Sequence, residues 1–210
     1  LEVINELAGA KNKVASVALR INPEVDAHTH AYITTGLKEN KFGINLSQLD
    51  SVLDLFETLK NVKLIGLHFH IGSQITDLTS FQSLCSRVTE IQENMARRRI
   101  LVENLNFGGG LGIDYHHPNH LPIPDFKEYF AIFHKHMKLR PEQQVHFEPG
   151  RSVVGQCGTL ITKVLYVKEG ASKNFAIVDA GFTELIRPAL YQAYHRIENL
   201  TSDEAEEVYD

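Results

Sequence analysis

The stretch VKLIGLHFHIGS, residues 62–73, joins an apolar run to a cluster of polar and small residues. The run from Val62 to His70 is rich in aliphatic side chains, which indicates a buried strand. Two histidines, a glycine and a serine stand where this strand would end. Parallel α/β folds build their sites in this way, at the C-terminal ends of successive strands.

The alternation of strand, loop and helix recurs along the chain. Further strands are predicted over residues 14–22, 101–107 and 145–147. They are apolar without a break, which is typical of a parallel sheet buried on both faces. Amphipathic spacing predicts helices over residues 1–8, 47–59, 76–98 and 125–137. The order predicts an α/β fold with a parallel sheet.

Two of these helices carry start signals. The run from Ser47 to Asp50 resembles a capping box, and Thr76 or Asp77 is placed to cap the helix that follows. That second helix has an apolar stripe at helical spacing, made of Phe81, Leu84, Val88 and Ile91. The polar stretch 23–43 precedes the helix predicted over residues 47–59 and is long enough to be a functional loop.

The pattern changes after residue 153. A long strand is predicted over residues 158–168 without a following helix, and a second strand over 175–178 after a turn. We therefore expect two domains: residues 1–153 form the α/β domain, and residues 154–210 begin a β-rich domain.

Composition excludes several classes of protein. The chain has 210 residues, 43% of them hydrophobic, and a formal net charge of −5, which argues against a general nucleic-acid binder. No apolar run has membrane-spanning length, so no membrane association is expected. Two distant cysteines, Cys85 and Cys157, give no disulfide framework and favour a reducing compartment. We interpret Cys85 as core filler and the basic run 97–99 as a solvated helix end.

Gly108, Gly109 and Gly110 follow a predicted strand and could let an anion approach backbone amides. A plain tight turn is the alternative. The run is neither a dinucleotide fingerprint nor a P-loop, since neither spacing is present. Gly150 and Arg151 would add further amides and a guanidinium suited to phosphate or carboxylate.

Glu148 precedes that pair and is predicted to be the last residue of its strand, facing the site. It has two interpretations, an ion pair with an arginine or a carboxylate beside a pyridine nitrogen. His70 is placed to stack on a flat ring, and Ser73 to donate its hydroxyl to a phosphate. A metal site on His68 and His70 lacks a third ligand at suitable spacing, so no metal is expected there. The loop histidines at 28, 30, 116 and 117 are interpreted as solvated or paired with carboxylates.

Arg187 and Tyr191 are four residues apart and would share one face of a helix. Arg187 could bind a carboxylate to which Tyr191 also donates a hydrogen bond. The alternative is a surface cation near an aromatic side chain at an interface.

These clusters, in this order, resemble the fold-type III pyridoxal-phosphate amino-acid decarboxylases over essentially the whole chain. The resemblance implies a (β/α)8 TIM barrel, here partial, followed by the start of a C-terminal β-domain. It also implies pyridoxal 5'-phosphate as cofactor, a small amino-acid substrate, and a cytoplasmic homodimer with shared active sites. The cofactor-binding residues that it implies are His70, Ser73, Gly110, Glu148, Pro149, Gly150 and Arg151. The substrate-binding residues are Arg151, Arg187 and Tyr191.

Departures from the family pattern matter as well. The lysine that binds the cofactor covalently stands in a Tyr-Ala-x-Lys motif, which is absent, and so is the active-site Cys-Glu-Ser segment. No catalytic residue is therefore assigned. We expect a central fragment of an enzyme, without turnover by itself.

Three competing functions stay open. Within the family, an ornithine, arginine or carboxynorspermidine decarboxylase is the first, although the segment 187–191 favours a substrate with two amino-acid head groups. A non-catalytic cofactor-binding homologue is the second. A metal-dependent TIM-barrel hydrolase built on His68 and His70 is the third.

Overall fold

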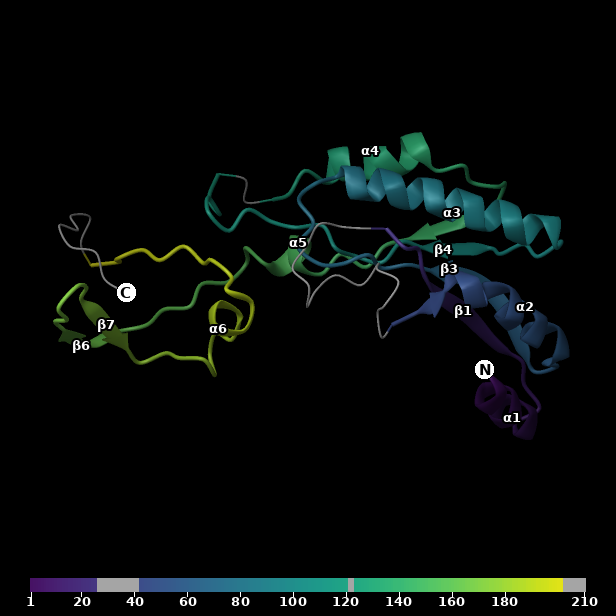
Figure 1. The fold of residues 1–210 in the computed structure, drawn as a ribbon, viewed down its shortest axis with the longest axis horizontal. Helices are drawn as coiled ribbons and strands as arrows, with labels where there is room; N and C mark the ends of the chain where they lie inside the picture. Colours follow the sequence, from purple (N-terminus) through teal and green to yellow (C-terminus); the bar gives the residue numbers. More distant parts are fainter. Residues whose placement is uncertain (26–41, 121–122, 202–210) are drawn as a thin grey trace. The chain divides into compact units, whose positions relative to one another are not determined.

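The computed structural model describes residues 1–25, 42–120 and 123–201 (Figure 1). Five strands form one sheet in the order β2-β1-β3-β4-β5, and every neighbouring pair is parallel. The expected α/β fold with a parallel sheet is confirmed. The strands are β1 (Ala15–Asn22), β2 (Ile44–Asn45), β3 (Val62–His68), β4 (Asn104–Asn106) and β5 (Gln144–His146).

Helices connect these strands as expected for parallel pairs: α2 (Leu49–Thr58) joins β2 to β3, α3 (Thr79–Arg97) joins β3 to β4, and α4 (Phe126–His136) joins β4 to β5. Figure 1 shows α3 and α4 side by side along the sheet, where the rings of Phe81 and Tyr129 meet edge to face at 5.0 Å. The predicted stripe of α3 is buried. The helices are α1 (Glu2–Ala10), the 3-10 turn η1 (Leu46–Gln48), α2 (Leu49–Thr58), α3 (Thr79–Arg97), α4 (Phe126–His136) and α5 (Arg151–Val154).

Burial on both faces of the sheet, predicted from the apolar strands, is wrong for the described residues. Leu19, Leu67 and Leu105 are paired in register and lie in the core, to which α2, α3 and α4 also contribute. The next register row runs through Arg20, His68, Asn106 and His146. Because neighbouring residues of a strand point to opposite faces, this polar row lies on the face away from the leucines. This polar row therefore lies along the C-terminal edge of the sheet.

Both predicted caps differ from the observed helix starts. The 3-10 turn η1 leads directly into α2, and the Leu49 amide donates to the Leu46 carbonyl, so Ser47 forms no cap hydrogen bond. Asp77 does accept from the backbone amide of Thr79 at 2.9 Å, but Leu78 stands at the cap position. Among the helices of the described ranges, α4 starts on a side-chain cap, where Asp125 accepts from the Glu128 amide. At α2 a backbone turn replaced the expected side-chain cap because it satisfies the same free amide, whereas the start of α3 keeps the side-chain bond from Asp77.

The predicted strands extend too far at several C-terminal ends. β3 and β4 end at His68 and Asn106, so His70 and Phe107 lie beyond them. β5 ends at His146, two residues before Glu148. Backbone bonding continues just past the strands, since the Phe69 amide donates to the Asn106 carbonyl at 2.8 Å and the Phe107 amide to the His146 carbonyl at 3.0 Å. Most of the predicted functional loop 23–43 lies outside the described residues.

The chain divides into two compact units, residues 1–112 with 124–153, and residues 113–123 with 154–210. The first holds the parallel sheet. In the second, β6 (Val164–Lys168) and β7 (Phe175–Val178) pair antiparallel, and α6 (Arg187–Tyr191) follows. The long strand predicted over 158–168 begins only at Val164. The segment 113–123 joins the second unit, which the sequence did not indicate.

Candidate functional site

Three loops interlock at the C-terminal edge of the parallel sheet: residues 69–75 after β3, 107–112 after β4, and 147–150 after β5. The Glu148 amide donates to the Gly108 carbonyl, and the Ile75 amide to the Gly110 carbonyl, each at 2.8 Å. These backbone bonds join segments far apart in sequence. They fix the predicted clusters of the first unit at one edge of the sheet, as the strand-end pattern indicated.

The glycine turn after β4 needs glycine for two physical reasons. Gly108 and Gly110 have φ values of +68° and +117°, a region that L side chains rarely adopt. Each also approaches neighbouring backbone closely: a Cβ on Gly108 would lie 2.4 Å from the Phe69 carbonyl oxygen, and one on Gly110 2.6 Å from that of Gly72. The turn is therefore a point at which the loops touch. It is more than a plain tight turn.

His70 faces this turn, because the Gly109 amide donates to its Nδ1 at 3.3 Å. That bond makes Nδ1 the acceptor and puts the ring proton on Nε2. Burial lowers the pKa of His70, and the positive charge of Arg20 lowers it further. Burial is also the main cause of the lowered pKa of His68. Both imidazoles are thus held in the neutral form, the one suited to packing flat against a ring.

Glu148 is exposed and lies among polar partners. Asn106 Nδ2 donates to its Oε1 at 2.8 Å, and His68 Nε2 lies 3.5 Å from its Oε2, longer than a good hydrogen bond. The prediction that Glu148 ends a strand is wrong. Arg151, its expected ion-pair partner on one interpretation, instead donates to Gln74 Oε1 at 3.1 Å. Glu148 is therefore oriented by Asn106 and placed near His68.

The other predicted residues of this unit surround the same edge. Ser73 is half-buried in the loop after β3, and Pro149 precedes Gly150 in the loop after β5. A Cβ added to Gly150 would meet nothing within 4 Å, so this position has open space beside it. Arg151 begins α5 and reaches the loop after β3 through Gln74.

Arg187 and Tyr191 lie in the second unit, on the short helix α6 as predicted. The Arg187 guanidinium donates to the hydroxyl of Tyr115 and lies 4.8 Å from the centre of that ring. The ring of His195 meets Tyr115 at 5.0 Å. Among the described residues, the buried Nε of Arg187 has no hydrogen-bond partner. The Tyr115 ring thus holds the Arg187 guanidinium in place, and the N–H at Nε is not used in a hydrogen bond to any described residue.

Sequence reasoning missed three residues: Arg20, Asn106 and Tyr115. Arg20 and Asn106 interrupt apolar strands near or at the strand end, and a polar side chain in that position was the available signal. Tyr115 gave no signal of its own, because its partner Arg187 is 72 residues away.

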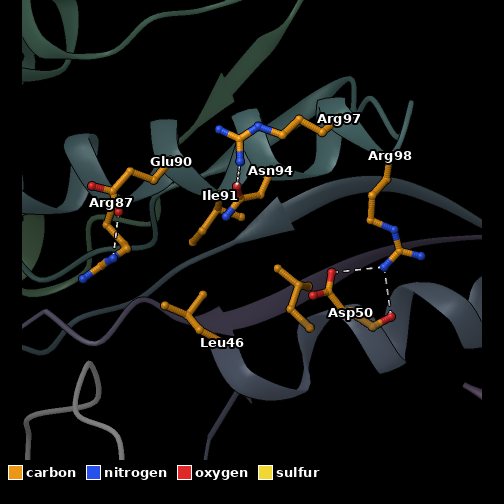
Figure 2. Close-up of a pocket in the computed structure, with 9 residues that line it drawn as sticks. Leu46, Asp50, Arg87, Glu90, Ile91, Asn94, Arg97 and Arg98 are labelled. Carbon is orange, nitrogen blue, oxygen red and sulfur yellow. Dashed lines mark hydrogen bonds and ion pairs between the residues drawn. The ribbon is translucent and has the colours of Figure 1, made fainter.

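A surface groove of about 430 Å³ lies between η1, α2 and α3, and none of the predicted site residues lines it (Figure 2). Four of its charged lining residues pair with one another, Arg87 with Glu90 and Arg98 with Asp50, and Arg97 donates to Asn94. Arg98 also pairs with Asp54, and these hydrogen bonds raise its pKa. The basic run 97–99 is therefore only partly a solvated helix end, since Arg98 ties the end of α3 to α2.

The remaining interpretations concern metals, cysteines and membranes. In the described ranges, no group of three His, Cys, Asp or Glu side chains could hold a metal ion. His117 pairs with Asp114 at 3.3 Å, as expected for a loop histidine, whereas residues 28 and 30 lie outside the described residues. Cys85 is buried in α3 and Cys157 is exposed. No helix in the part of the chain that the structure describes has the length and apolar character to span a membrane.

Comparisons with known proteins show what the whole chain is similar to. The chain is 66% identical over its full length to a diaminopimelate decarboxylase of Bacteroides thetaiotaomicron, covering 54% of that protein. It is 42% identical to the diaminopimelate decarboxylase of Haemophilus influenzae, covering 50%. The crystal structure of the Helicobacter pylori diaminopimelate decarboxylase, complexed with L-lysine, matches with a TM-score of 0.86 at 34% identity, over 97% of this chain and 50% of that one.

The chain thus spans about half the length of the curated relatives that it matches. A model of one protein family, described as "Pyridoxal-dependent decarboxylase, pyridoxal binding domain", matches residues 1–155, which include the whole parallel sheet and its three interlocked loops. The chain therefore belongs to the pyridoxal-dependent decarboxylases, and residues 1–155 match their pyridoxal-binding domain.

Proposed function

We propose that the chain is the central part of a diaminopimelate decarboxylase, which converts meso-2,6-diaminopimelate to L-lysine and carbon dioxide with pyridoxal 5'-phosphate. The observation that carries this proposal is the meeting of Glu148, His70 and the glycine turn at one sheet edge. The 66% identity to a named diaminopimelate decarboxylase supports the choice of substrate.

The residues at the sheet edge fit the cofactor chemically. An exposed carboxylate, Glu148, suits a protonated ring nitrogen, and the neutral imidazole of His70, whose pKa is lowered by burial, suits the ring face. The open space beside Gly150, together with the guanidinium of Arg151, suits a phosphate. We propose that Ser73, Gly110, Gly150 and Arg151 hold the phosphate group, and that Pro149 lines the same cofactor site.

Each residue then has a defined task. The bound cofactor supplies an electron-withdrawing ring that stabilises the charge left when carbon dioxide departs. Glu148 would accept a hydrogen bond from the ring nitrogen and so keep the proton on that atom. His70, kept neutral because burial lowers its pKa, would orient the ring without adding a competing positive charge. The substrate carboxylates would be bound by Arg151, Arg187 and Tyr191.

Other features of the whole protein are also proposals. We propose residues 1–153 as the cofactor domain and residues 154–210 as the start of a β-domain. We further propose a cytoplasmic homodimer with shared active sites, on the strength of the family resemblance alone. Light scattering of the purified full-length protein would test the dimer, and a monomeric mass would contradict it.

The experiment for the activity uses the full-length protein, purified with and without pyridoxal phosphate. L-Lysine formation from meso-2,6-diaminopimelate is measured by chromatography beside parallel assays with ornithine, arginine and carboxynorspermidine. We expect turnover of diaminopimelate only, and only with cofactor. Preferred turnover of another amino acid would refute the substrate, and cofactor binding without any turnover would indicate a non-catalytic homologue.

A further inference from the structure

Asn106 lies where the loops of the candidate site meet. It is the last residue of β4, in the register row that also holds His68 on one neighbouring strand and His146 on the other. Its side chain is half-buried on the face opposite the leucine core. The glycine turn begins two residues later, and Glu148 follows His146 by two residues.

The side-chain amide of Asn106 forms two hydrogen bonds in opposite senses. Its Oδ1 accepts from the Gly108 amide at 2.8 Å, and its Nδ2 donates to Glu148 Oε1 at 2.8 Å. The chemistry of the partners fixes the amide orientation, because a backbone N–H can only donate and an ionised carboxylate can only accept. Among side chains of this size, only a primary amide offers both functions in one rigid plane. The position therefore demands Asn rather than any small polar residue.

The consequence for Glu148 is a restricted orientation. An exposed glutamate is ordinarily free to rotate, and immobilising it costs side-chain entropy. Here Oε1 is held by Asn106, while Oε2 is 3.5 Å from His68 and keeps capacity to accept another hydrogen bond. The same amide binds the Gly108 N–H and so supports the first residue of the positive-φ turn. One side chain thus orients the carboxylate and stabilises the turn.

We propose that Asn106 is a positioning residue for the cofactor, because it orients the Glu148 carboxylate and couples it to the glycine turn. This inference rests on the proposed role of Glu148 at the ring nitrogen, although it does not depend on which amino acid is the substrate. Asn106 itself need not touch the cofactor. Its effect on cofactor binding should therefore vanish once Glu148 can no longer act.

The test compares four variants of the full-length protein: Asn106→Leu, Asn106→Asp, Glu148→Gln and the double variant Asn106→Leu/Glu148→Gln. Asn106→Asp keeps an oxygen for the Gly108 amide but replaces the donor toward Glu148 with a second carboxylate. Asn104→Leu is the matched control, since Asn104 lies on the same face of β4 and bonds to the Ile65 carbonyl and His146 instead. Pyridoxal phosphate affinity is measured by equilibrium titration, and folding by thermal unfolding of the apo-protein.

We expect Asn106→Leu and Asn106→Asp to weaken cofactor affinity about tenfold, the effect of losing a hydrogen bond to a charged group. Asn104→Leu should lower the unfolding temperature comparably to Asn106→Leu but leave affinity unchanged. In the double-mutant cycle, Asn106→Leu should cost little further affinity once Glu148→Gln is present. Unchanged affinity in both Asn106 variants, or additive losses in the cycle, would overturn the inference.

Failure of the proposed function would look different. If the wild-type protein binds pyridoxal phosphate but decarboxylates an amino acid other than diaminopimelate, the substrate is wrong and the four affinities still decide the role of Asn106. If the wild-type protein does not bind pyridoxal phosphate at all, both proposals are refuted.

Discussion

Substituting alanine at Gly108 should disrupt the site far more than the same change at Gly150. At Gly108, the φ of +68° would cost an alanine about 1–2 kcal/mol. Its Cβ would also meet the Phe69 carbonyl oxygen at 2.4 Å and His70 Nδ1 at 2.9 Å, and such overpacking costs about 1–3 kcal/mol. The sum is a loss of roughly 2–5 kcal/mol in the free energy of unfolding.

Gly150 is the matched control for the same chemical change. Its φ is not among the positive values in the described part of the chain, and an added Cβ would meet nothing within 4 Å. Alanine there should leave apo-protein stability unchanged or raise it by up to about 1 kcal/mol, through a less flexible unfolded state. Gly150→Ala should instead weaken pyridoxal phosphate binding if the phosphate occupies the space beside it.

Differential scanning calorimetry of the two apo-proteins measures the contrast, with each kcal/mol worth about 2–4 °C for a domain of this size. Cofactor affinity is then measured on the same samples. Equal unfolding temperatures for Gly108→Ala and Gly150→Ala would refute the reasoning, because they would mean that the turn relaxes without disturbing the neighbouring loops.

Burial and charge give three more predictions. Burial lowers the pKa of His68 and His70 below the ordinary value of 6.5, so the unfolded chain takes up protons first. The free energy of unfolding should therefore fall as the pH drops below about 6.5. The unfolding temperature of His70→Gln should depend less on pH than that of the wild type, and an equal dependence would contradict this prediction. Burial raises the pKa of Cys85 to about 12, so iodoacetamide at pH about 8 should label Cys157 but spare Cys85 in the native protein, as judged by mass spectrometry. Rapid labelling of both thiols would count against the buried position. Tyr115→Phe removes the hydroxyl that accepts from Arg187 and should raise the KM for diaminopimelate about tenfold without changing cofactor affinity, whereas Tyr194→Phe should change neither. An unchanged KM in Tyr115→Phe would mean that the hydrogen bond between Tyr115 and Arg187 does not contribute to substrate binding.

Much of the first unit was predictable because its signals are local. The stripe of α3, the start of α4 at Asp125 and the polar clusters after each strand follow from residue types a few positions apart. The parallel sheet follows from the alternation of these elements. The cap expected at Ser47 failed because a backbone turn satisfied the same amide, whereas Asp77 does accept from the Thr79 amide at the start of α3, although Leu78 stands at the cap position.

The site itself was predictable only in part. The sequence indicated His70 and Glu148 as candidates, because polar residues cluster after apolar strands. Both were predicted to end their strands, which in fact stop two residues earlier. Arg20 and Tyr115 were missed because their importance depends on partners that lie far away in the chain, at His70 and Arg187.

The order of the elements and the parallel arrangement were determined by the sequence alone, because hydrophobic periodicity is written in consecutive residues, and the family was indicated by the resemblance of the motifs after the strands. Only the tertiary structure decided which polar side chains share a row. The apolar pattern of a strand specifies which of its faces is buried, but the partner residue on the next strand is chosen by hydrogen bonds between segments far apart in the chain, such as β3 and β4. That register places Asn106 beside His68, within reach of both Gly108 and Glu148.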